Sequence, residues 1–355
     1  MVILQFGIPV VSVEAIMSGK HNNLYKDATM KQQSGVEFTA YFYSLINNAV
    51  MMLVRSLPST AQTSAMMFFL RYAGIVPGQP LDFFKNYYSP VWSCIPHIIH
   101  KINNVCAIVT DEFVNHAATA HAMIMLLHSL DDHIHDGQIK PDHLILLIRS
   151  QMWKLLWDAI TMLCSIIPNG MDIVNTCMDR YYASIVHNNS SCLEDYLHNF
   201  KDQMATGLIV PLITTQLTGH TSLQKGVRAS LEHFGIAWRI LDDIHDIEDD
   251  LYTGRISAVT LSLPQKMKRR FAELVKQESN TMQGEEMRSH NYDSFNKFAL
   301  EVHNVGIVNK LVKRIIVELE ASAHYAHNAG LSGLEQEIND LPCVWHINFS
   351  GIYDV

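Results

Sequence analysis

The stretch F-G-I-A-W-R-I-L-D-D-I-H-D-I-E-D-D, residues 234–250, carries a run of aspartates directly after an apolar segment. Residues four apart stack on one face of an α-helix, so Asp242, Asp246 and Asp250 are predicted to point the same way. Like charges held this close repel one another, raise one another's pKa and weaken the helix. The pattern therefore predicts a helix whose aspartates are offset by a bound cation.

A similar run, L-H-S-L-D-D-H-I-H-D-G, lies upstream at residues 127–137. It carries Asp131, Asp132 and Asp136, and the last two are again four residues apart. Hard divalent cations prefer carboxylate oxygens, and Mg²⁺ commonly takes one or two carboxylates together with substrate phosphate and water. Two such helices that face each other would form a cage for several Mg²⁺ ions and a diphosphate.

The competing interpretation is that both runs are solvated helix faces, which is the usual role of acidic runs. Both runs, however, directly follow strongly apolar segments, residues 120–130 and 234–241. A solvated face would alternate with apolar residues along the whole helix, so we expect an apolar wall that ends in an acidic rim. The predicted catalytic residues are Asp131, Asp132, Asp136, Asp242, Asp243 and Asp246, and the predicted metal ligands are Asp131, Asp132, Asp136, Asp242, Asp246 and Asp250.

The composition is typical of a thick helical protein. The chain has 355 residues, of which 48% are hydrophobic and 17% charged, and this is ample for a substantial core. Apolar residues recur at three- and four-residue spacing almost everywhere, and strand-like alternation is hard to find. We see no internal repeat and no dividing linker. The predicted fold class is all-α, with a peripheral segment at 1–35 and one helical domain at 36–355 around a central apolar cavity.

Punctuation by proline and glycine bounds the predicted helices. Asp142 and Ser222 are predicted N-caps, and Pro211 is expected to kink its helix or end it early. Residues 280–290 are expected to form a polar loop. The predicted helices cover 36–56, 59–73, 80–88, 103–135, 141–167, 170–187, 192–219, 222–251, 262–279, 290–328 and 333–340.

Charge and cysteine content exclude several classes of function. The net charge is −9 without a long basic run, which argues against nucleic acid as the main partner. The six cysteines are scattered without a C-x-x-C pair, and this favours a reduced cytoplasm. The N-terminus lacks the basic region of a signal peptide, and no stretch reaches the ~18 uninterrupted apolar residues that a spanning helix needs. We therefore expect a cytoplasmic protein without stable membrane insertion.

With these motifs in place, the sequence resembles the trans-isoprenyl diphosphate synthase and class I terpene synthase superfamily. Residues 234–246 resemble the family's second aspartate-rich motif, and the first motif matches as D-D-x-x-x-D at 131–136. T-G-R-I-S-A-V-T-L-S-L-P, residues 253–264, resembles the family's glycine-basic turn followed by Thr-Leu-Pro, and residues 194–209 resemble the helix that bears its Lys-Thr-Gly element. The resemblance implies the class I isoprenoid synthase helical bundle, with two facing aspartate-rich helices.

The resemblance also implies which residues bind the substrate. Three Mg²⁺ ions and a few basic residues would balance the negative charge of one diphosphate. Aromatic faces would stabilise the carbocation that forms when the diphosphate leaves. The predicted diphosphate-binding residues are Arg149, Lys201, Arg239 and Arg255, and the predicted cavity residues are Trp153, Trp157, Tyr181, Phe234 and Trp238.

Histidines lie in or beside both acidic runs, at His128, His133, His135 and His245. Imidazole is a poor ligand for Mg²⁺. We therefore expect these side chains to contact ligating carboxylates or phosphate, with ordinary surface positions as the alternative.

Departures from the family pattern bear on the reaction. Chain-elongating members hold a second diphosphate, but the upstream segment offers only Lys85, and Gly137 to Lys140 stand where paired arginines are expected. Ala205 occupies the lysine position of the Lys-Thr-Gly element, and Arg239 replaces a glutamine. A second diphosphate with so few cationic partners would be poorly neutralised, because phosphate binding relies on Arg and Lys.

Two functions remain. The leading hypothesis is a class I terpene synthase, a lyase that ionises a C10 to C25 allylic prenyl diphosphate with Mg²⁺, cyclises or rearranges the cation and releases diphosphate. The alternative is a prenyltransferase of the polyprenyl diphosphate synthase type, which elongates with isopentenyl diphosphate or uses a non-diphosphate acceptor. A non-catalytic partner subunit fits less well, because it would not need mutually repelling carboxylates. We expect a homodimer in either case.

Overall fold

The computed structural model describes residues 35–76, 78, 81–84, 89–103, 109–135, 137–186, 190–280, 295, 297–302 and 304–345. Within these ranges the regular structure is helical and no strand occurs, so the predicted all-α class is confirmed. Most of the predicted peripheral segment at 1–35, most of the predicted helix at 80–88 and the predicted loop beyond residue 280 lie outside the described residues, as do Lys85 and Asp136.

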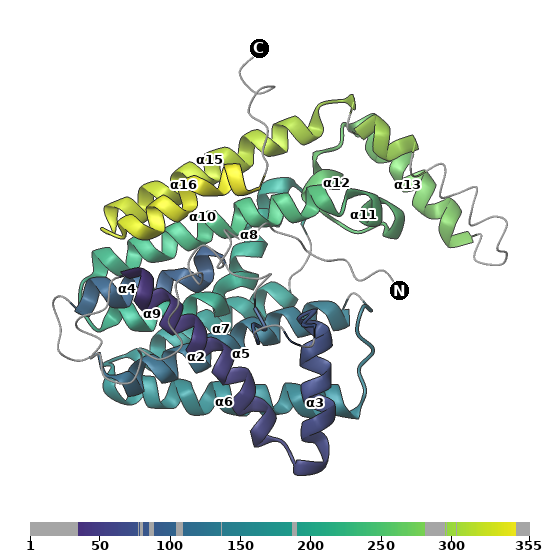
Figure 1. Ribbon diagram of the computed structural model, residues 1–355. Coiled ribbons are helices and arrows are strands. Elements are labelled where there is room, and N and C mark those ends of the chain that lie inside the picture. The colour runs from purple at the N-terminus through teal and green to yellow at the C-terminus, as the bar shows by residue number, and fades with distance from the viewer. Residues whose placement is uncertain are drawn as a thin grey trace.

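The helical elements follow one another along the chain without long described loops (Figure 1). Their bounds are α2 Gly35–Ser56, α3 Ser59–Tyr72, α4 Pro90–Asn103, α5 Asp111–His135, α6 His143–Ile166, α7 Gly170–Val186, α8 Leu193–Gln203, the 3₁₀ helix η2 Met204–Leu208, α9 Ile209–Gln216, α10 Thr221–His245, α11 Ile247–Thr253, α12 Ala258–Ser262, α13 Gln265–Asn280, α15 Ile307–Asn328 and α16 Ser332–Val344.

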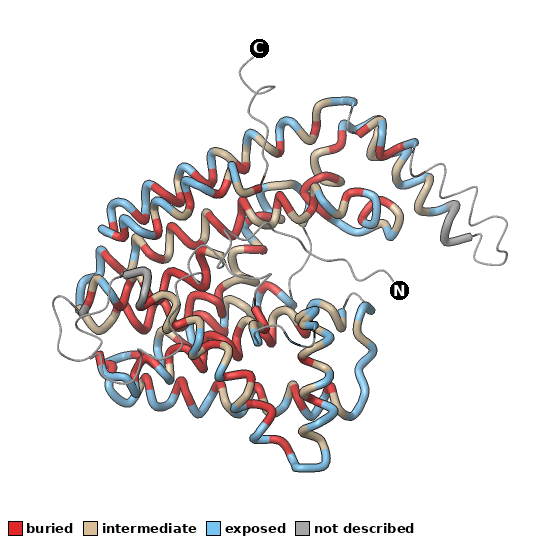
Figure 2. Tube along the Cα trace, in the orientation of Figure 1, coloured by how far each residue is buried: buried red, intermediate tan, exposed pale blue. Residues whose placement is uncertain are grey.

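Helix α5 lies in the core of the bundle. Between Ala117 and Leu127 every residue except Met125 is buried, and a helix that is apolar all round belongs inside a protein. It packs against α2 and α6, and Figure 2 shows buried residues concentrated along these inner faces. At its C-terminal end the helix emerges, with Asp131 half-buried and Asp132 exposed. An apolar wall that ends in an acidic rim is thus confirmed for this helix.

Helix α10 carries the second acidic run and is held by α15, which also packs against α16. Figure 1 shows α15 and α16 side by side along one side of the bundle, with α6 on the opposite side. Two buried serines join α10 and α15, because the Ser322 hydroxyl donates to the Ser230 carbonyl oxygen at 2.7 Å. The last turn of α10 is therefore positioned by the body of the fold.

Local signals acted as expected at some positions. Asp142 caps α6, since its carboxylate accepts a hydrogen bond from the Ile145 amide at 2.9 Å. Pro211 lies in α9, just after the 3₁₀ turn η2 that interrupts the predicted helix at 192–219. Proline lacks the amide that would bond four residues back, so the preceding turn tightens. The helix is thus interrupted before Pro211 and continues through the proline as α9, whereas a kink or an early end was predicted.

Several boundaries were wrong. No helix was predicted between residues 89 and 102, but Pro90 opens α4 there, because proline at the first helical position loses no intrahelical hydrogen bond. The N-cap of α10 is His220 and not Ser222. The predicted helix at 222–251 is divided at Asp246, where backbone angles of φ −93° and ψ 14° end α10 and begin α11. No helix among the described residues is long and apolar enough to cross a membrane.

Candidate active site

The second acidic run occupies the junction between α10 and α11. Although the helix is interrupted there, the amide of Asp246 donates to the carbonyl of Asp242 at 2.9 Å, and the amide of Asp250 donates to that of Asp246 at 2.8 Å. The four-residue spacing is thus preserved across the break. Asp243 and Asp250 are buried, with 1% and 6% of their surfaces exposed, whereas Asp242 and Asp246 are half-buried.

Burial of these carboxylates disfavours their charged form. Burial raises the pKa of Asp242 to about 7, Arg239 opposes the rise, and the charges of Asp246, Asp243 and Asp132 add to it. Burial likewise raises the pKa of Asp250 to about 7, with Asp243 as the next cause. The pKa of Asp246 is raised by burial and then by Asp249. Burial is thus the main cause of the raised pKa values, and repulsion from neighbouring carboxylates adds to it.

The first acidic run approaches the same place. The charge of Asp132 contributes to the raised pKa of Asp242, so the end of α5 lies close to the end of α10. Asp131 is already paired: Arg149 donates Nε to Oδ1 at 2.6 Å and Nη2 to Oδ2 at 2.8 Å. This two-pronged ion pair joins α5 to α6. Of the two adjacent aspartates, Asp132 is the one whose charge acts on Asp242.

The donor set fits divalent metal chemistry without forming a closed site. Within the described part of the chain, no three His, Cys, Asp or Glu side chains are grouped closely enough to hold a metal ion. Asp136 lies outside the described residues. Partly buried carboxylates whose pKa values are raised are nevertheless suited to Mg²⁺, which takes its remaining ligands from phosphate and water. Among the predicted ligands, the charges of Asp132 and Asp246 act on Asp242, and the charge of Asp246 acts on Asp250.

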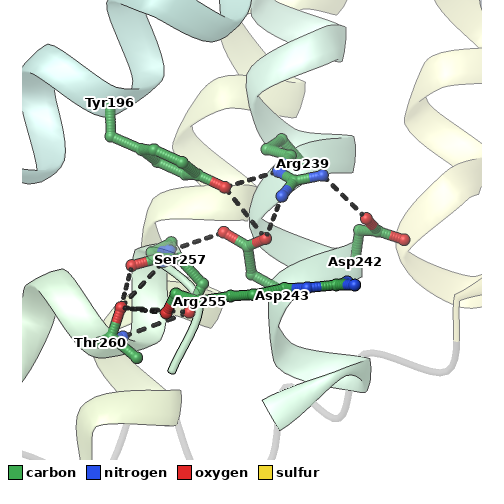
Figure 3. A network of polar contacts seen from close by, with 8 residues as sticks. Tyr196, Arg239, Asp242, Asp243, Arg255, Ser257 and Thr260 are labelled. Atoms are coloured by element: carbon green, nitrogen blue, oxygen red, sulfur yellow. Dashed lines mark hydrogen bonds and ion pairs between the residues drawn. The ribbon is translucent and has the colours of Figure 1, made fainter. Parts of the chain in front are cut away.

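Arg239 lies at the centre of a polar network (Figure 3). Its Nε donates to the hydroxyl of Tyr196 at 2.6 Å, its Nη1 pairs with Asp242 Oδ2 at 3.2 Å, and its Nη2 pairs with Asp243 Oδ1 at 3.1 Å. The guanidinium carbon also lies 5.7 Å from the centre of the Tyr196 ring and 5.5 Å from that of Phe200. We call Tyr196, Arg239, Asp242 and Asp243 the Arg239 network.

Asp243 connects this network to the following helix. Its Oδ1 accepts from the Tyr196 hydroxyl at 3.2 Å, and its Oδ2 accepts from the amide of Ala258 at 2.6 Å. Ala258 begins α12, whose N-terminus is closed by a reciprocal capping box between Ser257 and Thr260 (Figure 3). Asp243 therefore ties α10 to α8 and α12, and both of its carboxylate oxygens have donors within the protein.

The predicted diphosphate-binding cations differ in exposure and in their surroundings. Arg149 and Arg239 bind carboxylates, as described above. Arg255 is exposed in the turn after α11, and its charge lowers the pKa of Asp246; Figure 3 shows it extending beside the Arg239 network. Lys201 is half-buried near the end of α8. Arg255 is thus the cation most directly exposed at the rim of the acidic site.

A small pocket adjoins Asp131 between α5, α6, α7 and η2. Trp153 and Tyr181 line it, together with Leu127, His128 and others. Its free volume is about 20 Å³, which holds roughly one water molecule. This volume is far too small for a prenyl chain, so the predicted central apolar cavity stays a prediction.

The other predicted cavity residues lie elsewhere. Trp157 is 38% exposed, so it does not line this pocket. Phe234 is buried against the ring of Trp345, and Trp238 packs against Phe200. Helical spacing predicts that an apolar residue is buried, but it does not predict which helix packs against that residue.

The structure adds site residues that sequence reasoning had missed or left open. His128 is a pocket residue whose Nε2 contacts the Thr206 hydroxyl, and its ring meets that of Tyr181 edge-on at 5.6 Å. Burial lowers the pKa of His128 to about 4, so the imidazole is neutral at pH 7. Tyr196 was not singled out, because nothing in its spacing links it to an arginine on another helix.

The sequence matches no protein-family model and no curated protein. The fold, in contrast, is similar to those of prenyl synthases. A geranylgeranyl pyrophosphate synthase from Lactobacillus brevis is 14% identical with a TM-score of 0.64, covering 85% of this chain and 96% of that chain. A Caulobacter crescentus polyprenyl synthase complexed with calcium and isoprenyl diphosphate is 12% identical with a TM-score of 0.62, covering 86% and 96%.

A third structure, of geranylgeranyl pyrophosphate synthase from Corynebacterium glutamicum with isoprenyl diphosphate and magnesium, is 11% identical with a TM-score of 0.57 and covers 84% of this chain and 98% of that chain. The chain thus spans nearly the whole length of these proteins. It has the all-α fold of the polyprenyl and geranylgeranyl diphosphate synthases, and the resemblance seen in its motifs is confirmed at the level of the fold.

Proposed function

We propose that this protein is a Mg²⁺-dependent prenyltransferase of the polyprenyl diphosphate synthase type. It ionises an allylic prenyl diphosphate and transfers the prenyl group to an acceptor. The observation that carries the proposal is that the charges of Asp132 on α5 and of Asp246 act on Asp242, and that the pKa values of Asp242, Asp246 and Asp250 are raised. Structures with this fold contain isoprenyl diphosphate and calcium or magnesium, and they favour prenyl transfer over the terpene synthase hypothesis.

Each group of residues has a role in the proposed reaction. Asp132, Asp242, Asp246 and Asp250 would hold the divalent ions, which when bound neutralise the leaving diphosphate. Arg255 would contact the diphosphate oxygens from the exposed rim, with Lys201 as a second cation. The remaining residues of the site act on the organic part of the substrate. The apolar wall of α5 keeps water away from the carbocation, and the rings of Trp153 and Tyr181 face it in the pocket.

Cyclisation by a terpene synthase is the second candidate. It is favoured by the scarcity of cations for a second diphosphate. Ala205, at the position where the family has lysine, is fully buried, so no charge is available there. A non-diphosphate acceptor would be compatible with the same scarcity. The homodimer, the three-ion stoichiometry and the cytoplasmic location stay predictions.

Product analysis distinguishes these reactions. Purified protein should be incubated with Mg²⁺ and each C10 to C25 allylic diphosphate, alone and with radiolabelled isopentenyl diphosphate. We expect release of inorganic diphosphate that requires Mg²⁺ and increases when an acceptor is present. A cyclic hydrocarbon formed from the allylic diphosphate alone would contradict prenyl transfer and assign a terpene synthase. No turnover with any chain length would contradict both.

Replacement of Arg255 by alanine tests the diphosphate contact. A charge-assisted hydrogen bond contributes about 1.5–3 kcal/mol, so Arg255→Ala should weaken the binding of inorganic diphosphate roughly tenfold or more in calorimetry with Mg²⁺. Arg269→Ala is the matched control, because Arg269 is an exposed arginine on α13 and its loss should leave the affinity unchanged. Equal affinity in Arg255→Ala and wild type would exclude this contact.

A further inference from the structure

Tyr196 is a half-buried tyrosine on α8 that makes two hydrogen bonds within the acidic site. Its hydroxyl accepts from Arg239 Nε at 2.6 Å and donates to Asp243 Oδ1 at 3.2 Å (Figure 3). Burial raises the pKa of the phenol well above its ordinary value, so the hydroxyl keeps its single proton. One oxygen therefore orients both a cation and a carboxylate.

The arginine in this network is immobilised on every side. Its Nε, Nη1 and Nη2 each have a protein acceptor, and the guanidinium lies over the rings of Tyr196 and Phe200. Only about a quarter of the side chain, 27%, is exposed. A partly buried guanidinium is stable only when its donors are satisfied. Arg239 thus serves as a fixed internal counterion for Asp242 and Asp243.

The two carboxylates are used differently. Asp243 has donors on both oxygens, from Tyr196 and Arg239 on one and from the Ala258 amide on the other. Asp242 is held only through Oδ2, at a longer 3.2 Å. Its other oxygen has no hydrogen-bond donor within the described part of the chain. Asp242 is therefore the carboxylate of this pair that remains able to bind a cation.

We propose that Tyr196 is a positioning residue for the metal site: its hydroxyl holds Arg239 against Asp243 and so keeps the guanidinium from closing fully onto Asp242. The proposal rests on the proposed function only in assuming that Asp242 binds a divalent ion with a diphosphate. Without the hydroxyl, Arg239 Nε loses its acceptor and Asp243 loses a donor. The guanidinium is then free to form a two-pronged pair with Asp242, the geometry that Arg149 and Asp131 adopt, and this pair competes with the metal.

The test is Tyr196→Phe, which retains the ring over which Arg239 lies. Loss of a group that orients a metal ligand typically costs 10–100-fold in metal affinity. We expect the Mg²⁺ concentration for half-maximal binding of inorganic diphosphate, measured by calorimetry, to rise about tenfold or more. Saturating Mg²⁺ should restore kcat to near the wild-type value. Tyr325→Phe is the matched control, because Tyr325 stacks on His233 away from this site, and its Mg²⁺ dependence should equal that of wild type.

A second variant separates positioning from general loss of packing. In an Arg239→Gln background, adding Tyr196→Phe should have no further effect on the Mg²⁺ titration, because Tyr196 acts through Arg239. An additive effect, or a Tyr196→Phe titration identical to wild type, would overturn the proposal. The titration requires no prenyl substrate, so its result does not depend on the proposed reaction. If wild-type protein binds Mg²⁺ and diphosphate but turns over no prenyl diphosphate, the proposed reaction alone is refuted. Wild-type protein that binds neither refutes both.

Discussion

Asp246→Asn is expected to abolish turnover while leaving the helical circular dichroism signal close to that of wild type. Asp246 lies at the junction of α10 and α11, where burial and Asp249 raise its pKa, and in our proposal it holds a divalent ion. Asparagine has nearly the same shape but removes the charge that binds the metal. Loss of one preorganised electrostatic group costs roughly 10²–10³-fold in rate, so kcat should fall at least that far. Asp132→Asn, on the facing helix α5, should behave in the same way.

Glu248→Gln is the control for these variants. Glu248 is an exposed carboxylate on α11, two residues after Asp246. Its replacement by glutamine removes one negative charge but no predicted metal ligand. Its kcat should stay close to wild type. Full activity in either aspartate variant would refute the metal assignment. A collapse of the circular dichroism signal would instead show that the aspartates support the fold.

The stability of the metal-free protein should fall as pH rises from about 4 to about 8. Asp242 and Asp250 have pKa values of about 7 in the folded protein, against about 3.9 in an unfolded chain. Between these values the folded state binds more protons than the unfolded state, so the free energy of unfolding decreases with pH. The contribution is fully present below the unfolded pKa and is lost as pH rises through the folded pKa. Taken singly, each of the two groups should cost roughly 4 kcal/mol at pH 8, because its pKa lies about three units above the unfolded value.

Asp250→Asn isolates this effect, because the side chain is buried and asparagine cannot ionise. The variant should be more stable than wild type in denaturant unfolding at pH 8 with a chelator present, and the two curves should converge near pH 4. Adding Mg²⁺ and inorganic diphosphate should raise the stability of wild type at pH 8, because a ligand that binds only the folded state stabilises it. A variant less stable than wild type at pH 8 would contradict the raised pKa of Asp250.

Much of the fold was predictable because it depends on local patterns. The all-α class followed from three- and four-residue apolar spacing, and the apolar run before Asp131 correctly predicted a buried helix that surfaces at its acidic end. The interruption near Pro211 followed from a missing amide. The start of α4 at Pro90 was missed, because proline is compatible with both a break and a first helical turn.

The candidate site was predictable in its acidic residues and much less so in their partners. Four-residue spacing predicted Asp242, Asp246 and Asp250 on one face, and backbone hydrogen bonds keep that spacing across the break at Asp246. The roles of the arginines did not follow from spacing. Arg149 and Arg239 were predicted to bind diphosphate, yet the structure shows each of them holding carboxylates, and their contact with a diphosphate stays untested.

The sequence by itself determined the helical class, the two acidic runs and the register of their carboxylates, because all three depend on residues within a few turns of one another. Only the tertiary structure decided which charges are paired. It places Tyr196 of α8 against Arg239 of α10, and Arg149 of α6 against Asp131 of α5. Whether a carboxylate is free to bind a cation depends on its burial and on donors from other helices. Burial and donors from other helices depend on residues far apart in the sequence, so the spacing of residues within one helix does not predict them.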